Sequence, residues 1–224
     1  MTLLVACGLT REAAIIRRVG VIPIAGGGDP ARLEALLEDA IATFGPFSGV
    51  VSSGVAGGLD PALRPGDVVI GTLAASGSGD DRESTLVQAL CARLPGAHFG
   101  TIAGSDTIAA TLDQKRALRS STGAIAVDME SHIAARVAAR HALPFAIIRA
   151  ISDGADHVLP PAALVGMKPD GGMALGKVLA SLARRPTQLR ALIRTGRDAG
   201  RSFSALSRSW AALGDVEGEE RDRA

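Results

Sequence analysis

The amino-acid sequence predicts an α/β protein with three layers, in which helices cover both faces of a mostly parallel β-sheet. Short apolar runs typical of buried strands alternate along the chain with longer segments whose apolar residues recur at helical spacing. Hydrophobic residues make up 47% of the chain and aromatic residues only 3%, so Ala, Val, Leu and Ile must fill the core. A length of 224 residues suits one sizeable domain, alone or with an appendage.

The first elements have clear local signals. Residues 3–7 are apolar and predict a buried strand, and a helix over residues 11–18 follows, with Thr10 as its expected N-cap. The apolar run at residues 19–25 contains Pro23, which cannot donate a backbone hydrogen bond. An edge or irregular strand is therefore expected there.

Residues 26–28 are three glycines that precede a strong helix start at Asp29 and Pro30. No Lys-Ser or Lys-Thr pair follows these glycines, so they predict a turn and not a nucleotide-binding loop. The helix is expected to end at Gly45-Pro46.

The alternation continues through the middle of the chain. Further strands are predicted at residues 49–53, 68–75, 97–103, 124–127 and 145–151, and further helices at residues 84–93, 112–120 and 131–142. A polar loop rich in glycine is expected at residues 76–81. The first of these strands leads into a stretch of small residues, which would let backbone amides face a ligand over the strand end: Val55, Ala56, Gly57 and Gly58.

Two acidic residues, Glu130 and Asp153, stand where predicted strands end. Ligands of parallel α/β sheets bind at the carboxyl ends of the strands, so two carboxylates at that edge predict a site for acid–base chemistry. Each residue also has a plainer explanation, because Glu130 favours a helix N-terminus and Asp153-Gly154 suits a turn. Glu12 lies in the first turn of its predicted helix, where pairing with the helix dipole is the favoured explanation on local grounds.

The C-terminal part has a different character. A helix is predicted at residues 171–185, and residues 187–213 combine five arginines and several apolar side chains with a single acid, Asp198. This segment fits a solvated helix packed on the domain or on a second subunit, which we favour, and also a basic amphipathic helix on an anionic membrane surface. We divide the chain into a domain at residues 1–185, a helical extension at 186–213 and a polar tail at 214–224, for which disorder is expected.

Composition argues against several functional classes. The net charge of +1, without aromatic residues among the basic ones, gives no nucleic-acid signature. The four histidines and two cysteines show no metal-ligand spacing, and we expect no metal and reduced thiols. We expect no signal peptide and no membrane span, and therefore a cytoplasmic protein that is at most peripheral at the inner face of the membrane.

Several motifs, taken together, resemble a known family. Residues 53–59 (SGVAGGL) with 65–69 (PGDVV) look like the glycine-rich loop and next strand of the nucleoside phosphorylase/nucleosidase superfamily. Residues 126–130 (AVDME) and 149–156 (RAISDGAD) resemble two signatures of its methylthioadenosine/S-adenosylhomocysteine nucleosidases. The resemblance covers about residues 1–185 and implies a mixed, largely parallel central sheet. The Arg-rich C-terminus looks most like the hopanoid-associated branch, which removes adenine from adenosylhopane.

The resemblance implies a role for each acidic residue. Asp153 matches the donor that protonates N7 of the departing base, and Glu130 matches the carboxylate that binds the ribose hydroxyls. Met129 matches the residue that packs on the sugar face, while Arg149 and Ser152 would orient the Asp153 loop.

The resemblance also favours water over phosphate as the nucleophile. Glu12 matches the base that activates water in nucleosidases, and its carboxylate would repel phosphate. Val55 stands where family members commonly have a Ser that contacts phosphate or the nucleophile. Arg11 and Arg64 remain alternative sources of positive charge. No cofactor is expected. Inorganic phosphate is expected to take part only if the enzyme is a phosphorylase.

The substrate implied by the resemblance is an adenine nucleoside with a large hydrophobic 5′ group. Ile108 and Ala109 lie near the position where nucleosidases usually carry an aromatic that stacks on the purine, and this change opens room. A lipid-like substrate would also explain membrane contact through residues 187–213, and a homodimer is expected. The alternatives are a methylthioadenosine/S-adenosylhomocysteine nucleosidase, a purine nucleoside phosphorylase and, from another class, an inactive nucleoside-binding module.

Overall fold

The computed structural model describes residues 2–74, 81–164 and 174–214. The described strands are β1 (Leu3–Cys7), β2 (Val21–Ala25), β3 (Gly49–Gly58), β4 (Val68–Leu73), β5 (His98–Gly104), β6 (Ala126–Asp128) and β7 (Phe145–Asp153). The described helices are α1 (Thr10–Ile16), α2 (Pro30–Phe44), α3 (Asp81–Arg93), α4 (Leu112–Thr122), α5 (Ser131–Arg140), α6 (Pro161–Leu164), α7 (Leu175–Arg184), the short 3₁₀ helix η1 (Pro186–Gln188) and α8 (Leu189–Leu213).

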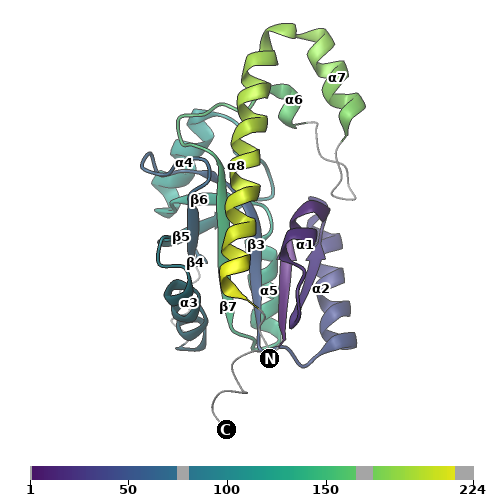
Figure 1. Cartoon of the computed structure of the whole chain (residues 1–224), viewed down its shortest axis with the longest axis vertical. Helices are drawn as coiled ribbons and strands as arrows, with labels where there is room; N and C mark the ends of the chain where they lie inside the picture. Colours follow the sequence, from purple (N-terminus) through teal and green to yellow (C-terminus); the bar gives the residue numbers. More distant parts are fainter. Residues whose placement is uncertain (1, 75–80, 165–173, 215–224) are drawn as a thin grey trace.

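The strands form one seven-stranded mixed sheet in the order β2-β1-β3-β6-β5-β4-β7, with a further pairing of β3 with β7 (Figure 1). The pairs β3–β6 and β4–β7 are antiparallel and the other pairs are parallel. Because β3 contacts β1, β6 and β7, the strands β3, β7, β4, β5 and β6 close into a ring. The ten-residue β3 is therefore the strand that joins both parts of the sheet.

Helices cover both faces of the sheet, which confirms the three-layer prediction. One core cluster joins α2 and α5, through residues such as Leu37 and Val137, to the side chains of Leu4 and Ile147. The other joins α1, α3 and α8 to the opposite faces of the same strands. Side chains of β7 alternate between the two clusters, as expected for a strand buried on both faces.

Several local predictions are confirmed. The strand with Pro23, β2, pairs with β1 alone and is an edge strand. Asp29 caps α2 by accepting a hydrogen bond from the Arg32 backbone N–H at 3.0 Å, and Pro30 is the first helical residue. The glycines before α2 make a turn in which Gly27 and Gly28 have positive φ angles.

Other local predictions are wrong in detail. Thr10 is the first residue of α1 and Leu9 is its N-cap. Residues 54–58, predicted as a loop, continue β3 as far as Gly58, because they find pairing partners on β6 and β7. The short helix α6 was not predicted. The predicted loop at 76–81 falls largely outside the described residues, as does nearly all of the predicted tail at 214–224.

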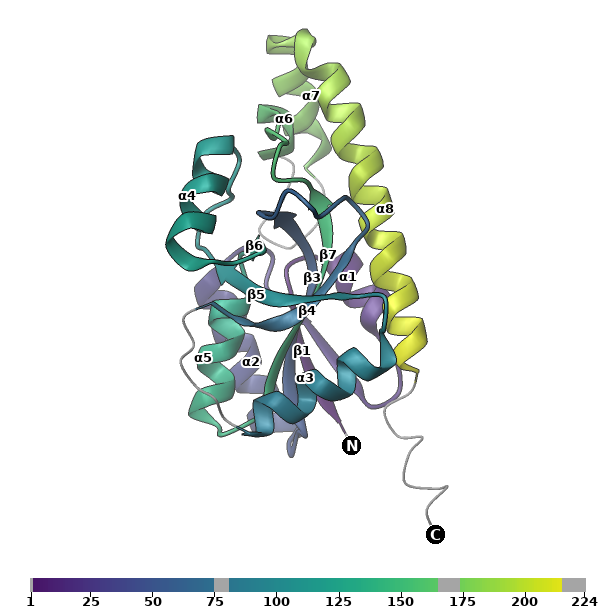
Figure 2. The same ribbon diagram turned by 90° about the vertical axis from the view of Figure 1, so that its left-hand side faces the viewer.

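The C-terminal helix α8 has 25 residues and runs along one side of the molecule (Figure 2). Its second half is part of the core, because Phe203, Leu206, Trp210 and Leu213 are all buried. Trp210 donates a hydrogen bond from Nε1 to Ser53 Oγ on β3 at 2.9 Å. This half of α8 is therefore packed on the domain, so the apolar side of residues 203–213 cannot also face a membrane. Among the described residues, no helix has the length and apolar character needed to cross a membrane.

We predict that Trp210→Ala lowers the free energy of unfolding by about 3–5 kcal/mol, because it leaves a large cavity between α8 and the sheet. Urea denaturation monitored by circular dichroism measures this loss. The control is Ile193→Ala on the same helix, whose side chain is 46% exposed and should change stability little. A similar small effect in both variants would show that α8 does not stabilise the domain.

Candidate active site

The three acidic residues predicted for the site are buried and lie at or after the carboxyl ends of strands. Glu12 is in α1, directly after β1; Glu130 precedes α5, directly after β6; and Asp153 is the last residue of β7. A methyl group on Gly8 would lie 2.6 Å from Glu130 Oε1 and 3.6 Å from Glu12 Oε2, so these two carboxylates flank one glycine. A methyl group on Gly57 would lie 3.4 Å from Asp153 Oδ2. The small residues of this region therefore leave space for the acidic groups.

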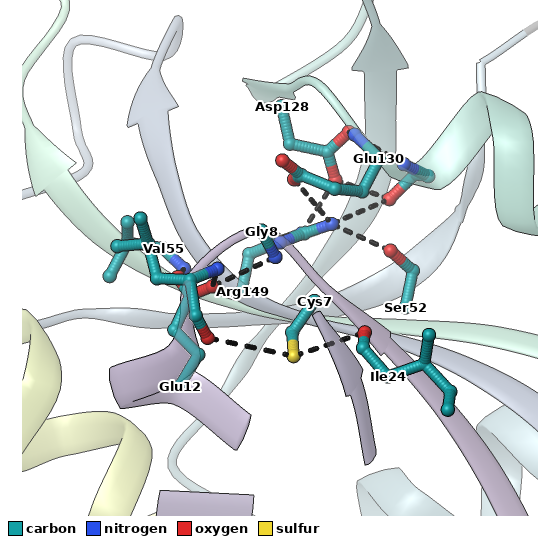
Figure 3. Close-up of polar contacts among 11 residues, drawn as sticks. Cys7, Gly8, Glu12, Ile24, Ser52, Val55, Asp128, Glu130 and Arg149 are labelled. Atoms are coloured by element: carbon teal, nitrogen blue, oxygen red, sulfur yellow. Dashed lines mark hydrogen bonds and ion pairs between the residues drawn. The ribbon is translucent and has the colours of Figure 1, made fainter. Parts of the chain in front are cut away.

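Arg149 lies at the centre of the site and is fully buried (Figure 3). Its Nε lies 2.5 Å from Asp128 Oδ2, and its Nη2 lies 3.4 Å from Glu130 Oε2. Nη2 also donates hydrogen bonds to Ser52 Oγ at 2.6 Å and Ser131 Oγ at 3.3 Å. The described contacts of Arg149 go to the carboxylates on the Glu130 side and to two serines, and its orienting role for the Asp153 loop stays a prediction.

Glu12 accepts hydrogen bonds from three backbone N–H groups. Gly8 and Leu9 donate to Oε2 at 3.0 and 2.8 Å, and Val55 of β3 donates to Oε1 at 2.8 Å. Leu9 is the N-cap of α1, so Glu12 also provides a hydrogen-bond acceptor for a backbone N–H group at the N-terminus of that helix. Burial raises the pKa of Glu12 above its ordinary value, while Arg149 and the three N–H groups oppose that rise. A carboxylate of raised pKa is suited to accept a proton.

Glu130 makes no side-chain hydrogen bond to the end of α5, although it occupies the N-cap position. Asp128 serves that end instead, by accepting from the Ser131 backbone N–H at 3.0 Å. The pKa of Glu130 is raised to about 8, mainly by burial and also by Asp128 and Glu12, while Arg149 opposes the rise. This raised pKa favours the protonated form of Glu130 over the range between its ordinary pKa and about 8.

Asp153 has a separate set of partners. Its Oδ2 forms an ion pair with Lys115 Nζ, and its Oδ1 lies 2.7 Å from Ser152 Oγ. Lys115 comes from α4 and also donates to the Gly154 carbonyl at 2.7 Å. The pairing of β3 with β7 is irregular just before this point, because Ala56 pairs with Ile151 but Gly57 pairs with Asp153. Such a bulge re-aims the side chains that follow it.

The other predicted site residues lie around these groups. Met129 and Glu130 line a small hollow beside Gly26, Gly28 and Pro30. In β3, the Ala56 carbonyl lies 3.1 Å from Ser152 Oγ, and a methyl group on Gly58 would lie 3.1 Å from the Asp153 carbonyl oxygen.

Ile108 and Ala109 lie in the segment between β5 and α4. Ala109 is buried in a small cluster with Leu59, Ala103, Ala124 and Val127, and Ile108 is half-buried. The structure thus places Ala109 in a packing role beside the site.

Sequence reasoning missed two residues, Asp128 and Lys115. Asp128 stands in the same motif as Glu130, and a buried arginine such as Arg149 of β7 requires an acidic partner, which was a signal that could have found it. Lys115 lies on a helix with several other basic residues, so no local pattern distinguishes it.

Within the described ranges, no group of His, Cys, Asp and Glu side chains is arranged to hold a metal ion. His132 and His141 pair instead with Asp106 and Glu38 at the surface. Cys7 and Cys91 carry free thiols.

Comparison with known proteins gives both a family and a fold. The model of the phosphorylase superfamily matches residues 21–184. Among solved structures, the chain is similar to 5′-methylthioadenosine/S-adenosylhomocysteine nucleosidase from S. pneumoniae, at 19% identity and a TM-score of 0.62, over 95% of this chain and 100% of that one. It is also similar to futalosine hydrolase from Helicobacter pylori, at 18% identity and a TM-score of 0.61, over 95% and 98% of the two chains. The 5′-methylthioadenosine/S-adenosylhomocysteine nucleosidase from H. pylori is similar at 18% identity and a TM-score of 0.61, over 93% of this chain and 97% of that one. These matches confirm the predicted fold class.

We predict that the ligand-free protein loses stability as pH rises from about 4.5 to 8. In that range folded Glu130 holds a proton that the unfolded chain has released, so the unfolded state binds fewer protons and stability falls with pH. Glu130→Gln should reduce this fall and be more stable than the wild type at pH 8. Thermal melts at a series of pH values measure both effects.

Glu34→Gln is the matched control. Glu34 lies on the surface, and its pairing with Arg140 and Arg136 lowers its pKa, so this variant should keep the wild-type fall between pH 4.5 and 8. An equal fall in Glu130→Gln and the wild type would mean that Glu130 is ionised in the empty site.

Proposed function

The chain belongs to the phosphorylase superfamily, and from its three buried carboxylates we propose that it cleaves the N-glycosidic bond of an adenine nucleoside. The observation that carries the proposal is the burial of Glu12, Glu130 and Asp153 at the carboxyl ends of their strands. Retention of all three acidic groups in one site argues against an inactive nucleoside-binding module.

The chemistry requires groups of different kinds at the two ends of the bond. As the bond between C1′ and the base nitrogen breaks, positive charge develops on the ribose and negative charge on the base. Asp153 is proposed to supply the proton to N7 of the base, supported by Ser152. Glu130 is proposed to bind the ribose hydroxyls, with Met129 against the sugar face.

We favour water as the nucleophile because of the way Glu12 is bound. The backbone N–H groups of Gly8, Leu9 and Val55 form the kind of donor set that would bind an anion, and the Glu12 carboxylate already occupies it. Phosphate would have to displace this carboxylate and enter a region that already holds Glu130. A water molecule can instead donate a proton to Glu12, whose Oε1 accepts one described hydrogen bond and retains a free lone pair.

The proposed substrate is adenosylhopane, which would yield ribosylhopane and adenine in hopanoid biosynthesis. The resemblance of the C-terminal part to the hopanoid-associated branch supports this choice. The helices α6 and α7 and the start of α8 lie beyond the carboxyl end of β7 (Figure 1). Exposed apolar side chains on these helices and on the segment before them also support the choice: Val158, Leu164, Leu179, Leu189 and Ile193. They could receive a hydrocarbon group attached at the 5′ carbon.

A smaller 5′ group is the alternative. The nucleosidase from H. pylori has been solved with 5′-methylthioadenosine in its active site, and that from S. pneumoniae with the transition-state inhibitor MT-ImmA. These similarities support an adenine nucleoside and leave methylthioadenosine or S-adenosylhomocysteine as the second candidate substrate.

The resemblance further supports a homodimer in the cytoplasm that needs no cofactor. Because residues 203–213 are packed on the domain, we now restrict the proposed peripheral membrane contact to the first part of α8, where Leu189 and Ile193 are exposed.

We expect the wild type to release free adenine at the same rate with and without inorganic phosphate. The substrate panel is adenosylhopane, methylthioadenosine, S-adenosylhomocysteine and inosine, with adenine or hypoxanthine quantified by chromatography. Adenosylhopane should give the highest kcat/KM. Turnover that depends on phosphate would overturn hydrolysis, and a preference for methylthioadenosine would select the alternative substrate.

Glu12→Gln and Asp153→Asn should each lower kcat by about 10²- to 10⁴-fold, because each removes one proton-transfer group. Matched controls are Glu34→Gln and Asp113→Asn, which change acidic residues at the surface and away from the site. The controls should keep wild-type rates, and circular dichroism should show all four variants folded. A folded Glu12→Gln or Asp153→Asn variant with full activity would refute the role given to that residue.

A further inference from the structure

Lys115 is a buried cation for which the proposed function has so far given no role. Its side chain is 1% exposed, and a lysine is almost never buried to this extent unless it is paired. The ammonium group forms the ion pair with Asp153 Oδ2 and donates to the Gly154 carbonyl. It reaches the site from α4, whose other basic residues, Arg116 and Arg119, are largely exposed or pair with surface acids.

The ion pair raises a difficulty for a simple acid role of Asp153. A carboxylate that is paired with an ammonium group is ionised, and an ionised carboxylate has no proton to give. Both oxygens of Asp153 have partners, because Oδ1 lies beside Ser152 Oγ and Oδ2 beside Lys115 Nζ. Of these two partners, the ammonium group is a stronger acid than the serine hydroxyl.

Stability alone does not account for this arrangement. Replacing a buried ion pair by apolar residues is often neutral or stabilising, whereas removing one partner leaves an uncompensated charge. Arg149 cannot take the place of Lys115, since the described contacts of its guanidinium go to Asp128, Glu130 and two serines. Asp153, the carboxylate proposed to act on the base, thus has its own cation, Lys115.

On the basis of the proposed function, we propose that Lys115 is a positioning residue that supplies, through Asp153, the proton taken up by the departing base. The bond between C1′ and N9 breaks and its electron pair goes to the base. The Lys115 ammonium first transfers a proton to the Asp153 carboxylate and becomes a neutral amine, and Asp153 then transfers this proton to N7. Water forms the new bond to C1′ and gives its proton to Glu12. Transfer of that proton to solvent and reprotonation of Lys115 restore the starting state.

The test compares Lys115→Gln with Lys115→Arg on two substrates. Glutamine can donate hydrogen bonds to Asp153 and Gly154 but has no acidic proton. Arginine keeps the positive charge but does not release a proton at accessible pH. With the adenine nucleoside, both variants should lose about 10²-fold or more in kcat. With the same nucleoside methylated at N7, whose base leaves without taking up a proton, both should remain close to the wild-type rate.

Two further variants serve as controls. Arg116→Gln changes the exposed neighbour on α4 and should keep full activity on both substrates. His157→Asn changes another buried titratable group in the region, whose pKa is lowered by burial, and tests whether histidine rather than lysine supplies the proton. Circular dichroism and thermal melts establish that each variant is folded.

The outcomes separate this inference from the function on which it rests. If the wild type cleaves the nucleoside and Lys115→Arg matches it, Lys115 is only an orienting charge and the proton route is overturned. Equal loss on both substrates would likewise assign Lys115 a purely structural role. If the wild type cleaves no adenine nucleoside, the proposed function itself fails.

Discussion

The site depends on one constraint, the compensation of several buried negative charges by two buried cations. Arg149 is fully buried beside Asp128, Glu130 and Glu12, and desolvation of these acids would be very unfavourable without it. The sequence must also leave space for the charged groups. At Gly54 a methyl group would lie 2.6 Å from Glu12 Oε1 and 2.7 Å from Arg149 Nη1, so glycine is required there. The glycines of β3 thus allow a charged site inside a closely packed sheet.

The two cations divide the site into two parts with different electrostatics. Arg149 faces the carboxylates assigned to the sugar and to water, and its permanent charge cannot be lost by proton transfer. Lys115 faces Asp153, assigned to the base, and lysine can release a proton when it is buried. A permanent positive charge suits the stabilisation of the carboxylates that are proposed to act on the sugar. A cation that can lose its proton suits proton delivery to the base. The choice of arginine at one end and lysine at the other therefore follows the proposed chemistry.

The C-terminal helix is connected to the site through the sheet. Trp210 donates a hydrogen bond to Ser53, and Ser202 Oγ donates to the Ile151 carbonyl at 2.5 Å, so α8 contacts both β3 and β7. Buried Asp198 is held by Arg201 at 2.8 Å, which allows an acid within an otherwise basic helix. The same amphipathic pattern that suits a membrane surface is satisfied here by the domain's own core over the second half of the helix. The large apolar side chains that α8 exposes, Leu189 and Ile193, are both in its first half.

The sequence by itself determined the order of strands and helices, the three-layer arrangement and the positions of Glu12, Glu130 and Asp153 at strand exits, because hydrophobic spacing and local start signals carry that information. It left the function of each acid open until several motifs were considered together. Only the tertiary structure decided that residues 54–58 form a strand, that Arg149 serves the Glu130 side, that Lys115 pairs with Asp153 and that α8 packs on β3. Each of these depends on groups far apart in the chain: 38 residues separate Lys115 from Asp153, 97 separate Ser52 from Arg149 and 157 separate Ser53 from Trp210. Such contacts are set by how the sheet closes and not by any local pattern, which is the physical reason that the sequence alone could not specify them.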